Sequence, residues 1–139
     1  MPTDDAETLP EAFWGVARSL RHLSREALSP WDITPSHGRA LGVPIRHGVL
    51  RLTELADHLH IAPRSATEVV DGLQERTLVE RRSDPQDRRA TLVGLTAEGR
   101  AVAEAIDSAR TAEAARFFAV LSDEDRADLT RILRALHRY

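Results

Sequence analysis

Two adjacent arginines, Arg88 and Arg89, follow Asp87 in a polar stretch between two apolar segments. The stretch, residues 82–89, is rich in turn-forming residues and predicts a protruding link. A guanidinium at such a tip can enter a narrow DNA minor groove, whose focused negative potential favours it. A carboxylate two residues earlier can hold that guanidinium in one rotamer. The tip is therefore a candidate nucleic-acid contact, and a charged loop that only aids solubility is the alternative.

A second group of polar residues lies at the start of a helix predicted over Pro63–Glu75, whose apolar residues recur every three or four positions. The outward residues near its N-terminal end are Arg64, Ser65, Thr67 and Glu68. Polar side chains at the leading end of a helix suit contacts with base edges in a major groove. The free N–H groups of the first turn favour phosphate. An ordinary solvated helix end is the alternative interpretation.

The elements that carry these residues follow from the spacing of apolar positions. Helices are predicted over residues 6–28, 35–41, 54–59, 63–75 and 97 to about 121, with a last helix that ends near Tyr139. Strands over 78–81 and 90–95 flank the charged link as a β-hairpin, and a short strand is predicted near 49–51. Gly42 and Pro44 are expected to end the second helix. The order predicts a mainly α fold with a small β-hairpin, a winged helix-turn-helix.

Composition narrows the function classes. The 139 residues suit one domain and contain no cysteine, which excludes disulfides and thiol chemistry. The basic residues are all arginine, and the net charge of −3 argues against indiscriminate coating of nucleic acid. No apolar run approaches the ~20 residues that span a bilayer. The acidic N-terminus lacks a signal-peptide pattern, so a cytoplasmic location is expected.

Several motifs occur together in a fixed order. They are Leu52-Thr53-Glu54-Leu55-Ala56, Pro63-Arg64-Ser65-Ala66-Thr67, Leu78-Val79-Glu80-Arg81, Asp84-Pro85-Gln86-Asp87-Arg88-Arg89 and Leu95-Thr96-Ala97-Glu98-Gly99. Across about residues 9–138 the chain resembles the MarR family of transcription regulators. The most specific part is the Asp-x-Arg pattern of Asp87 and Arg89 ahead of Leu-Thr-x-x-Gly.

The resemblance implies one domain over residues 1–139, with a DNA-binding lobe over 32–96 and dimerisation helices over 6–28 and 97–139. A homodimer also agrees with the apolar stripes of the terminal helices, which a small winged domain cannot cover alone. The implied function is a sequence-specific regulator of transcription, expected to be a repressor. It would bind a pseudo-palindromic operator in double-stranded DNA and associate with the nucleoid.

The resemblance also assigns roles to the polar residues. Arg89 is expected to enter the minor groove with Asp87 steadying it, Arg88 is a phosphate candidate, and the Pro63–Glu75 helix is expected to contact the major groove. Two residues depart from the family pattern. Thr77 stands where glycine is common, and a left-handed threonine would be strained, so a different turn is an open alternative here. Gly72 stands where a longer polar residue is common, which removes a phosphate contact.

Members of this family often bind small aromatic or phenolic compounds between the dimer helices and the winged lobe, so an effector of that class is expected. The candidate lining residues are Trp14, Trp31, His37, Arg39, His47 and Arg100. A Trp–Arg pair such as Trp14 and Arg100 can hold an aromatic carboxylate by stacking and charge. The alternative is that both tryptophans are core or interface residues.

Other function classes have weaker signals. The sequence has no Gly-rich phosphate loop, no HExxH and no Gly-x-Ser-x-Gly, so no catalysis is expected. His58 and His60 point to different helix faces, and no His-x3-His pair occurs, so neither a metal nor a cofactor is expected. A winged helix that docks protein partners without specific DNA binding is the alternative from another class. The arginine-bearing tip argues against it.

Overall fold

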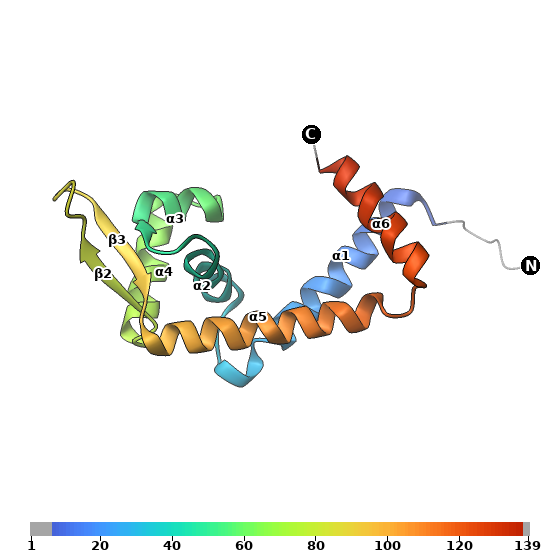
Figure 1. The fold of residues 1–139 in the computed structure, drawn as a ribbon, viewed down its shortest axis with the longest axis horizontal. Helices are drawn as coiled ribbons and strands as arrows, with labels where there is room; N and C mark the ends of the chain where they lie inside the picture. Colours follow the sequence, from blue (N-terminus) through green and yellow to red (C-terminus); the bar gives the residue numbers. More distant parts are fainter. Residues whose placement is uncertain (1–6, 138–139) are drawn as a thin grey trace, which may run out of the picture. The chain divides into compact units, whose positions relative to one another are not determined.

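The computed structural model describes residues 7–137. Figure 1 shows the elements in chain order. They are α1 (Leu9–Glu26), the 3-10 helix η1 (Ser29–Trp31), α2 (Pro35–His47), β1 (Leu50–Arg51), α3 (Leu52–Leu59), α4 (Pro63–Glu75), β2 (Val79–Ser83), β3 (Thr91–Leu95), α5 (Ala97–Phe118) and α6 (Asp123–Leu136). The predicted fold class, mainly helical with a small β-hairpin, is confirmed.

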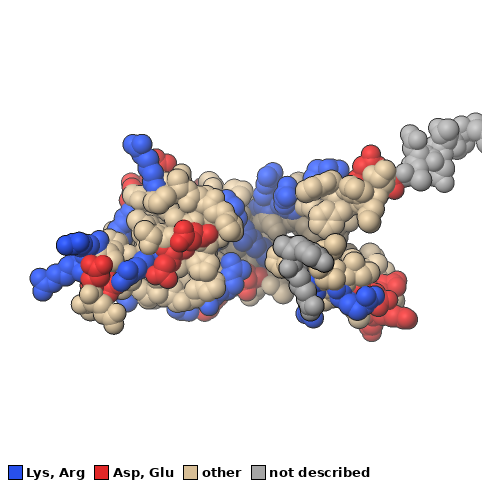
Figure 2. Space-filling model, turned by 90° about the horizontal axis from the view of Figure 1, so that it is seen from above, with Lys and Arg blue, Asp and Glu red and all other residues tan. Residues whose placement is uncertain are grey.

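The strands form one antiparallel sheet in the order β1-β3-β2. The β2–β3 hairpin runs from Val79 opposite Leu95 to Ser83 opposite Thr91. β1 adds only two residues to the other edge of β3. The short strand predicted near residues 49–51 is therefore confirmed. In Figure 2, arginine side chains project at the end of the molecule where the hairpin tip lies.

The chain divides into two units, which we call the central unit (residues 25–109) and the terminal unit (residues 1–24 and 110–139). The central unit has a close-packed apolar core supplied by α2, α3, α4, the sheet and the first part of α5. Its most deeply buried large side chains are Leu28, Leu41, Leu55, Val70, Leu73 and Val93. Burial of each such side chain stabilises the fold by about 1.5–3 kcal/mol, so the core fixes where α4 and the hairpin lie.

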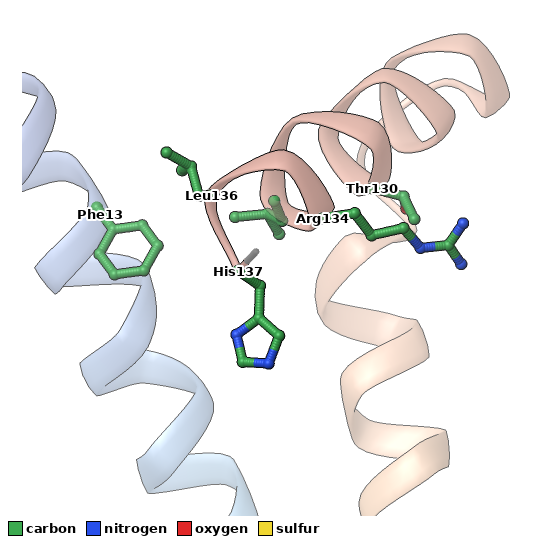
Figure 3. A pocket seen from close by; sticks show the side chains of 6 residues that line it. Phe13, Thr130, Arg134, Leu136 and His137 are labelled. Carbon is green, nitrogen blue, oxygen red and sulfur yellow. The ribbon is translucent and has the colours of Figure 1, made fainter. Parts of the chain in front are cut away.

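The terminal unit contains α1, α6 and the second part of α5, and neither α1 nor α6 buries any residue. Large apolar side chains stay exposed on both helices, including Leu9 at 83%, Trp14 at 54% and Leu136 at 63%. Figure 3 shows a pocket of about 560 Å³ between Phe13 on α1 and the C-terminal part of α6. Within residues 7–24 and 110–137, this unit therefore has no buried apolar core of its own.

The predicted end of the second helix at Gly42 and Pro44 is wrong, because α2 continues to His47. A proline inside a helix removes one hydrogen bond and costs about 3 kcal/mol. Pro44 is nevertheless buried together with Leu41 and Val43, and this packing offsets the penalty. The helix ends instead at Gly48, whose φ of 74° is left-handed.

Other boundaries differ by small amounts. α3 begins at Leu52 rather than Glu54, since the carboxylate of Glu54 accepts the Arg51 N–H at 3.2 Å and closes the first turn. α1 covers most of the predicted 6–28 helix, and Ala6 and Tyr139 lie outside the described residues. The limits of α4 match the prediction, and the predicted hairpin is present. Its first strand extends to Ser83, however, so two residues of the predicted link pair with β3.

Candidate DNA interface

A short turn joins α3 to α4. His60 adopts a left-handed φ of 55°, and its N–H donates to the carbonyls of Ala56 and Asp57. The Ile61 N–H also donates to Ala56, at 3.1 Å. Pro63 then occupies the first position of α4, where its fixed φ suits a helix start. The predicted helix-turn-helix is confirmed.

The leading end of α4 presents polar side chains to solvent. Arg64, Ser65 and Glu68 are exposed, while Ala66 faces the core. Thr67 is half-buried, and its hydroxyl donates to the Pro63 carbonyl at 3.0 Å. That bond uses the only proton of the hydroxyl, so Thr67 can offer an external partner its oxygen lone pairs and its methyl group.

Gly72 lies on the same face of α4 as Ser65 and Glu68 but farther along the helix, where α4 meets α2. A Cβ built on Gly72 would lie 2.7 Å from Cε1 of His37 on α2, so the glycine leaves room for the imidazole. Burial first, and then the charge of Arg76, lower the pKa of His37. The missing side chain at position 72 is therefore a packing feature between α2 and α4.

The hairpin tip, residues 84–90, is closed by backbone bonds. The Asp84 N–H donates to the Ala90 carbonyl at 3.3 Å, and the Ala90 N–H donates to the Asp87 carbonyl at 3.0 Å. Arg88 and Arg89 are both exposed. Within the described residues, no carboxylate holds either guanidinium in an ion pair. Both cations therefore face solvent on a closed turn.

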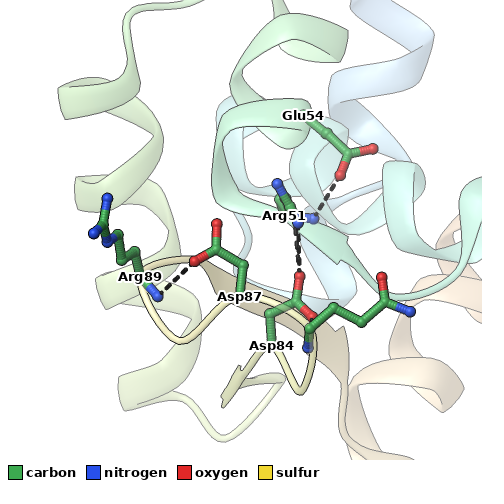
Figure 4. Close-up of polar contacts among 6 residues, drawn as sticks. Arg51, Glu54, Asp84, Asp87 and Arg89 are labelled. Carbon is green, nitrogen blue, oxygen red and sulfur yellow. Dashed lines mark hydrogen bonds and ion pairs between the residues drawn. The ribbon is translucent and has the colours of Figure 1, made fainter.

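Asp87 supports the tip differently from the expectation that it holds the Arg89 guanidinium. Its Oδ1 accepts the backbone N–H of Arg89 at 3.0 Å (Figure 4). The carboxylate therefore shapes the turn on which Arg89 is carried, and the guanidinium itself stays free.

Sequence reasoning missed two side-chain links at the hairpin. Arg51 forms an ion pair with Asp84, from Nη2 to Oδ2 at 3.0 Å. Arg81 on β2 forms an ion pair with Asp71 on α4 at 2.5 Å and also bonds Gln74. The Asp-Pro pair at residues 84–85 signals a turn, but no local pattern pairs Asp84 with a residue 33 positions earlier.

Comparison with known proteins follows this geometry. The family model described as "MarR family" matches residues 45–91, the segment from the end of α2 to the start of β3. A MarR family protein from Bacillus stearothermophilus has a similar solved structure, with 28% identity, a TM-score of 0.84 and coverage of 94% of this chain and 91% of that chain. This chain belongs to the MarR family.

Two further relatives give the same result. MepR, a transcription regulator of the Staphylococcus aureus multidrug efflux pump MepA, is 25% identical, with a TM-score of 0.82 over 93% of this chain and 98% of its own. The transcriptional repressor MdtR of Bacillus subtilis is 28% identical over 80% of this chain and 72% of its own length. The MarR-family chain is a DNA-binding transcription regulator and not an enzyme. No helix in residues 7–137 is both long and apolar enough to cross a bilayer.

Thr77 is left-handed, with a φ of 60°, in spite of the strain expected for a non-glycine residue at this turn. Its hydroxyl lies 2.7 Å from Oε2 of Glu98, and its carbonyl accepts the Thr96 hydroxyl at 2.6 Å. These bonds join the end of α4 to the start of α5 and offset part of the conformational strain, which is roughly 1–2 kcal/mol for a non-glycine residue.

The candidate effector residues fall in both units. Trp14 lies in the terminal unit, and the other five lie in the central unit. Several of these five already have internal roles. The Trp31 carbonyl accepts from Arg76 at 2.8 Å, His37 covers Gly72, and His47 stacks on His58 with ring centroids 4.2 Å apart.

The remaining candidate residues of the MarR-family chain are exposed. Arg39 faces solvent, and Arg100 is exposed near Glu104, with the closest charged atoms 3.9 Å apart. The structure therefore does not gather the candidate residues into one pocket within a single unit.

A second pocket, of about 300 Å³, lies along α3 and is lined by Glu54, Asp57, His58 and His60. His60 belongs to the turn after α3 and not to the helix itself. No group of three or more side chains in residues 7–137 is arranged to hold a metal ion. The histidines here accordingly take part in stacking and turn formation.

Proposed function

We propose that this MarR-family chain is a homodimeric repressor that binds a pseudo-palindromic operator in double-stranded DNA. Each subunit would place the leading end of α4 in a major groove and the hairpin tip in the adjacent minor groove. The observation that carries the proposal is that one central unit exposes both the polar start of α4 and the arginine-bearing tip. MdtR is named a repressor, which supports repression. Such a regulator would act in the cytoplasm, on the nucleoid.

In the major groove, the proposal assigns contacts to the exposed side chains of α4. Arg64 can bind guanine or a phosphate bidentately, and Glu68 can accept from cytosine. Ser65 can donate or accept. Thr67 is restricted to accepting a bond or to contacting the thymine methyl group, because its proton is already used. These four residues would carry the sequence preference.

In the minor groove, the proposal assigns Arg89, with Arg88 on a neighbouring phosphate. Both side chains are exposed, and the Asp87 carboxylate, which accepts the Arg89 N–H, fixes the turn that carries them. An arginine already free of carboxylate partners need not break an ion pair to bind DNA. The negative potential of the narrow groove therefore favours its entry, and no ion pair has to be broken first.

The terminal unit supports a homodimer. α1 and α6 bury no residue in the single chain and expose Leu9, Phe13, Trp14 and Leu136. Apolar patches of this kind mark interaction sites, and a second copy would cover them. Two-fold symmetry then predicts half-sites about one helical turn apart, ~10 bp. A monomer that protects an unsymmetrical site in footprinting would contradict this.

We also propose that a small aromatic or phenolic compound releases the DNA. Such an effector must bind more tightly to the shape that does not bind DNA. Of the candidate residues, the two exposed arginines of the central unit, Arg39 and Arg100, are proposed to contact it. A thermal-shift screen of aromatic acids, followed by DNA-release assays of the hits, tests this. Release unchanged in Arg39→Ala and Arg100→Ala variants would contradict the assignment.

Fluorescence anisotropy with labelled operator tests the DNA contacts. Arg89→Ala is expected to weaken binding by about 1–3 kcal/mol per contact, while the fold stays intact. Arg116→Ala is the matched control, because this arginine is 76% exposed and lies on α5 in the terminal unit. Equal affinities for the two variants would refute the wing assignment.

The salt dependence of the same binding separates DNA recognition from protein docking. Each phosphate neutralised in duplex DNA contributes a slope of about −0.9 to the plot of log affinity against log salt. Several arginine–phosphate contacts therefore predict a steep fall. Binding that is absent or indifferent to salt would favour a protein-docking winged helix instead.

A further inference from the structure

One carboxylate joins the tip of the hairpin to the start of the helix-turn-helix. Asp84 directly follows β2 and is only 8% exposed. Its Oδ2 accepts from Arg51 at both Nε, at 3.2 Å, and Nη2, at 3.0 Å. Figure 4 shows Arg51 between Asp84 and Glu54, whose carboxylate accepts the Arg51 backbone N–H. Arg51 thus connects β1, the first turn of α3 and the tip.

The position of this contact matters because the backbone support of the hairpin stops short of the tip. β1 pairs with β3 only at Leu50 and Arg51, opposite Val93 and Leu92. Beyond that register the hairpin pairs only with itself. The ion pair between Arg51 and Asp84 therefore supplies a tie to the helix-turn-helix at the point where the sheet no longer does.

The same carboxylate also shapes the tip. Oδ1 of Asp84 accepts the Gln86 N–H at 2.9 Å. This bond chiefly, together with the Arg51 guanidinium, lowers the pKa of Asp84 although burial opposes the shift. The two carboxylate oxygens of Asp84 have different partners: Oδ1 accepts from the turn, and Oδ2 accepts from Arg51. Movement of Arg51 would accordingly be transmitted to the turn that carries Arg89.

We propose that Arg51 is a positioning residue, which through Asp84 fixes the offset between the arginine-bearing tip and α4. The inference rests on the proposed function, in which Arg89 and α4 enter adjacent grooves of one duplex. Ordering a loose tip on DNA would subtract from the binding free energy, and a tip tied in advance avoids that loss. The side chain of Arg51 is 42% exposed and can keep this contact while DNA is bound.

A double-mutant cycle in operator affinity tests the inference. The cycle combines Arg51→Met, which keeps a long side chain but removes the ion pair, with Arg89→Ala. In the wild type, Arg89→Ala is expected to lower the affinity for the operator by about tenfold or more. In the Arg51→Met background, the same substitution is expected to lower that affinity by no more than about threefold. Arg64→Ala, on the leading end of α4, is expected to cost the same factor in both backgrounds.

The outcomes separate the inference from the proposed function. If Arg89→Ala has no effect in the wild type, the wing assignment itself fails. If Arg89→Ala costs its full factor in the Arg51→Met background, the positioning role is overturned. Arg51→Lys keeps the charge but offers one nitrogen in place of Nε and Nη2, so it should restore only part of the coupling. Urea unfolding confirms that each variant is folded, and Asp84→Asn replaces Arg51→Met if that variant does not fold.

Discussion

Gly99 provides a sharp test of how α5 is held against the hairpin. A Cβ built at this residue would lie 1.7 Å from the carbonyl oxygen of Leu78 and 2.6 Å from its carbon. The obstacle is backbone, so no side-chain rotation can relieve it. The same Leu78 carbonyl accepts the Thr96 N–H at 3.1 Å, and the Gly99 N–H donates to the Thr96 hydroxyl at 2.9 Å. Gly99→Ala must therefore separate α5 from the segment that precedes β2.

The magnitude follows from these contacts. Non-bonded carbon and oxygen rarely approach closer than about 3.3 Å, so the gap must open by roughly 1.5 Å. Forcing a group into a packed site costs about 1–3 kcal/mol, and each hydrogen bond lost costs about 0.5–1.5 kcal/mol. Because alanine is a better helix former than glycine, the substitution also stabilises the helix by up to ~1 kcal/mol. The net loss expected is about 2–4 kcal/mol, or roughly 10–25 °C in Tm for a small domain.

Urea and thermal unfolding followed by circular dichroism measure this loss. Gly42→Ala is the matched control, since it lies in a helix of the same unit and its Cβ would meet only the end of the Arg46 side chain, at 3.3 Å. The control is expected to be neutral or stabilised by up to ~1 kcal/mol. If Gly99→Ala changed the free energy of unfolding by less than ~0.5 kcal/mol, the close backbone contact would be refuted.

Three further predictions concern the packing around α4. Gly72→Ala should destabilise the protein by about 1–2 kcal/mol because of its clash with His37, and His37→Ala should abolish that cost in urea unfolding; a cost that persists would contradict the contact. The lowered pKa of His37 predicts stability that is fully present above the unfolded value near 6.5 and lost as pH falls toward the folded value, so His37→Gln should flatten unfolding free energies measured between pH 7.5 and 5. Thr77→Val keeps the shape but removes the hydroxyl, whose one proton can go to the Arg76 carbonyl at 2.6 Å or to Oε2 of Glu98 at 2.7 Å, and calorimetry should show a loss of about 0.5–1.5 kcal/mol; an unchanged Tm would show that this hydroxyl does not stabilise the fold.

Local signals in the sequence determined most of the elements. The spacing of apolar residues and the proline at position 63 placed α4 within the limits that the structure shows. Turn-forming residues between two apolar segments placed the hairpin. These features depend on residues within a few positions of one another, so their physics is present in the sequence itself.

Tertiary packing decided the rest. Local propensity ends a helix before Pro44, yet burial among the α2 core residues keeps the helix going to His47. The space over Gly72 is set by His37, and the space over Gly99 is set by the Leu78 carbonyl. The partner of Asp84 lies 33 positions away. Each of these contacts joins segments that meet only after the chain has folded, because their energies depend on distances that sequence spacing does not encode.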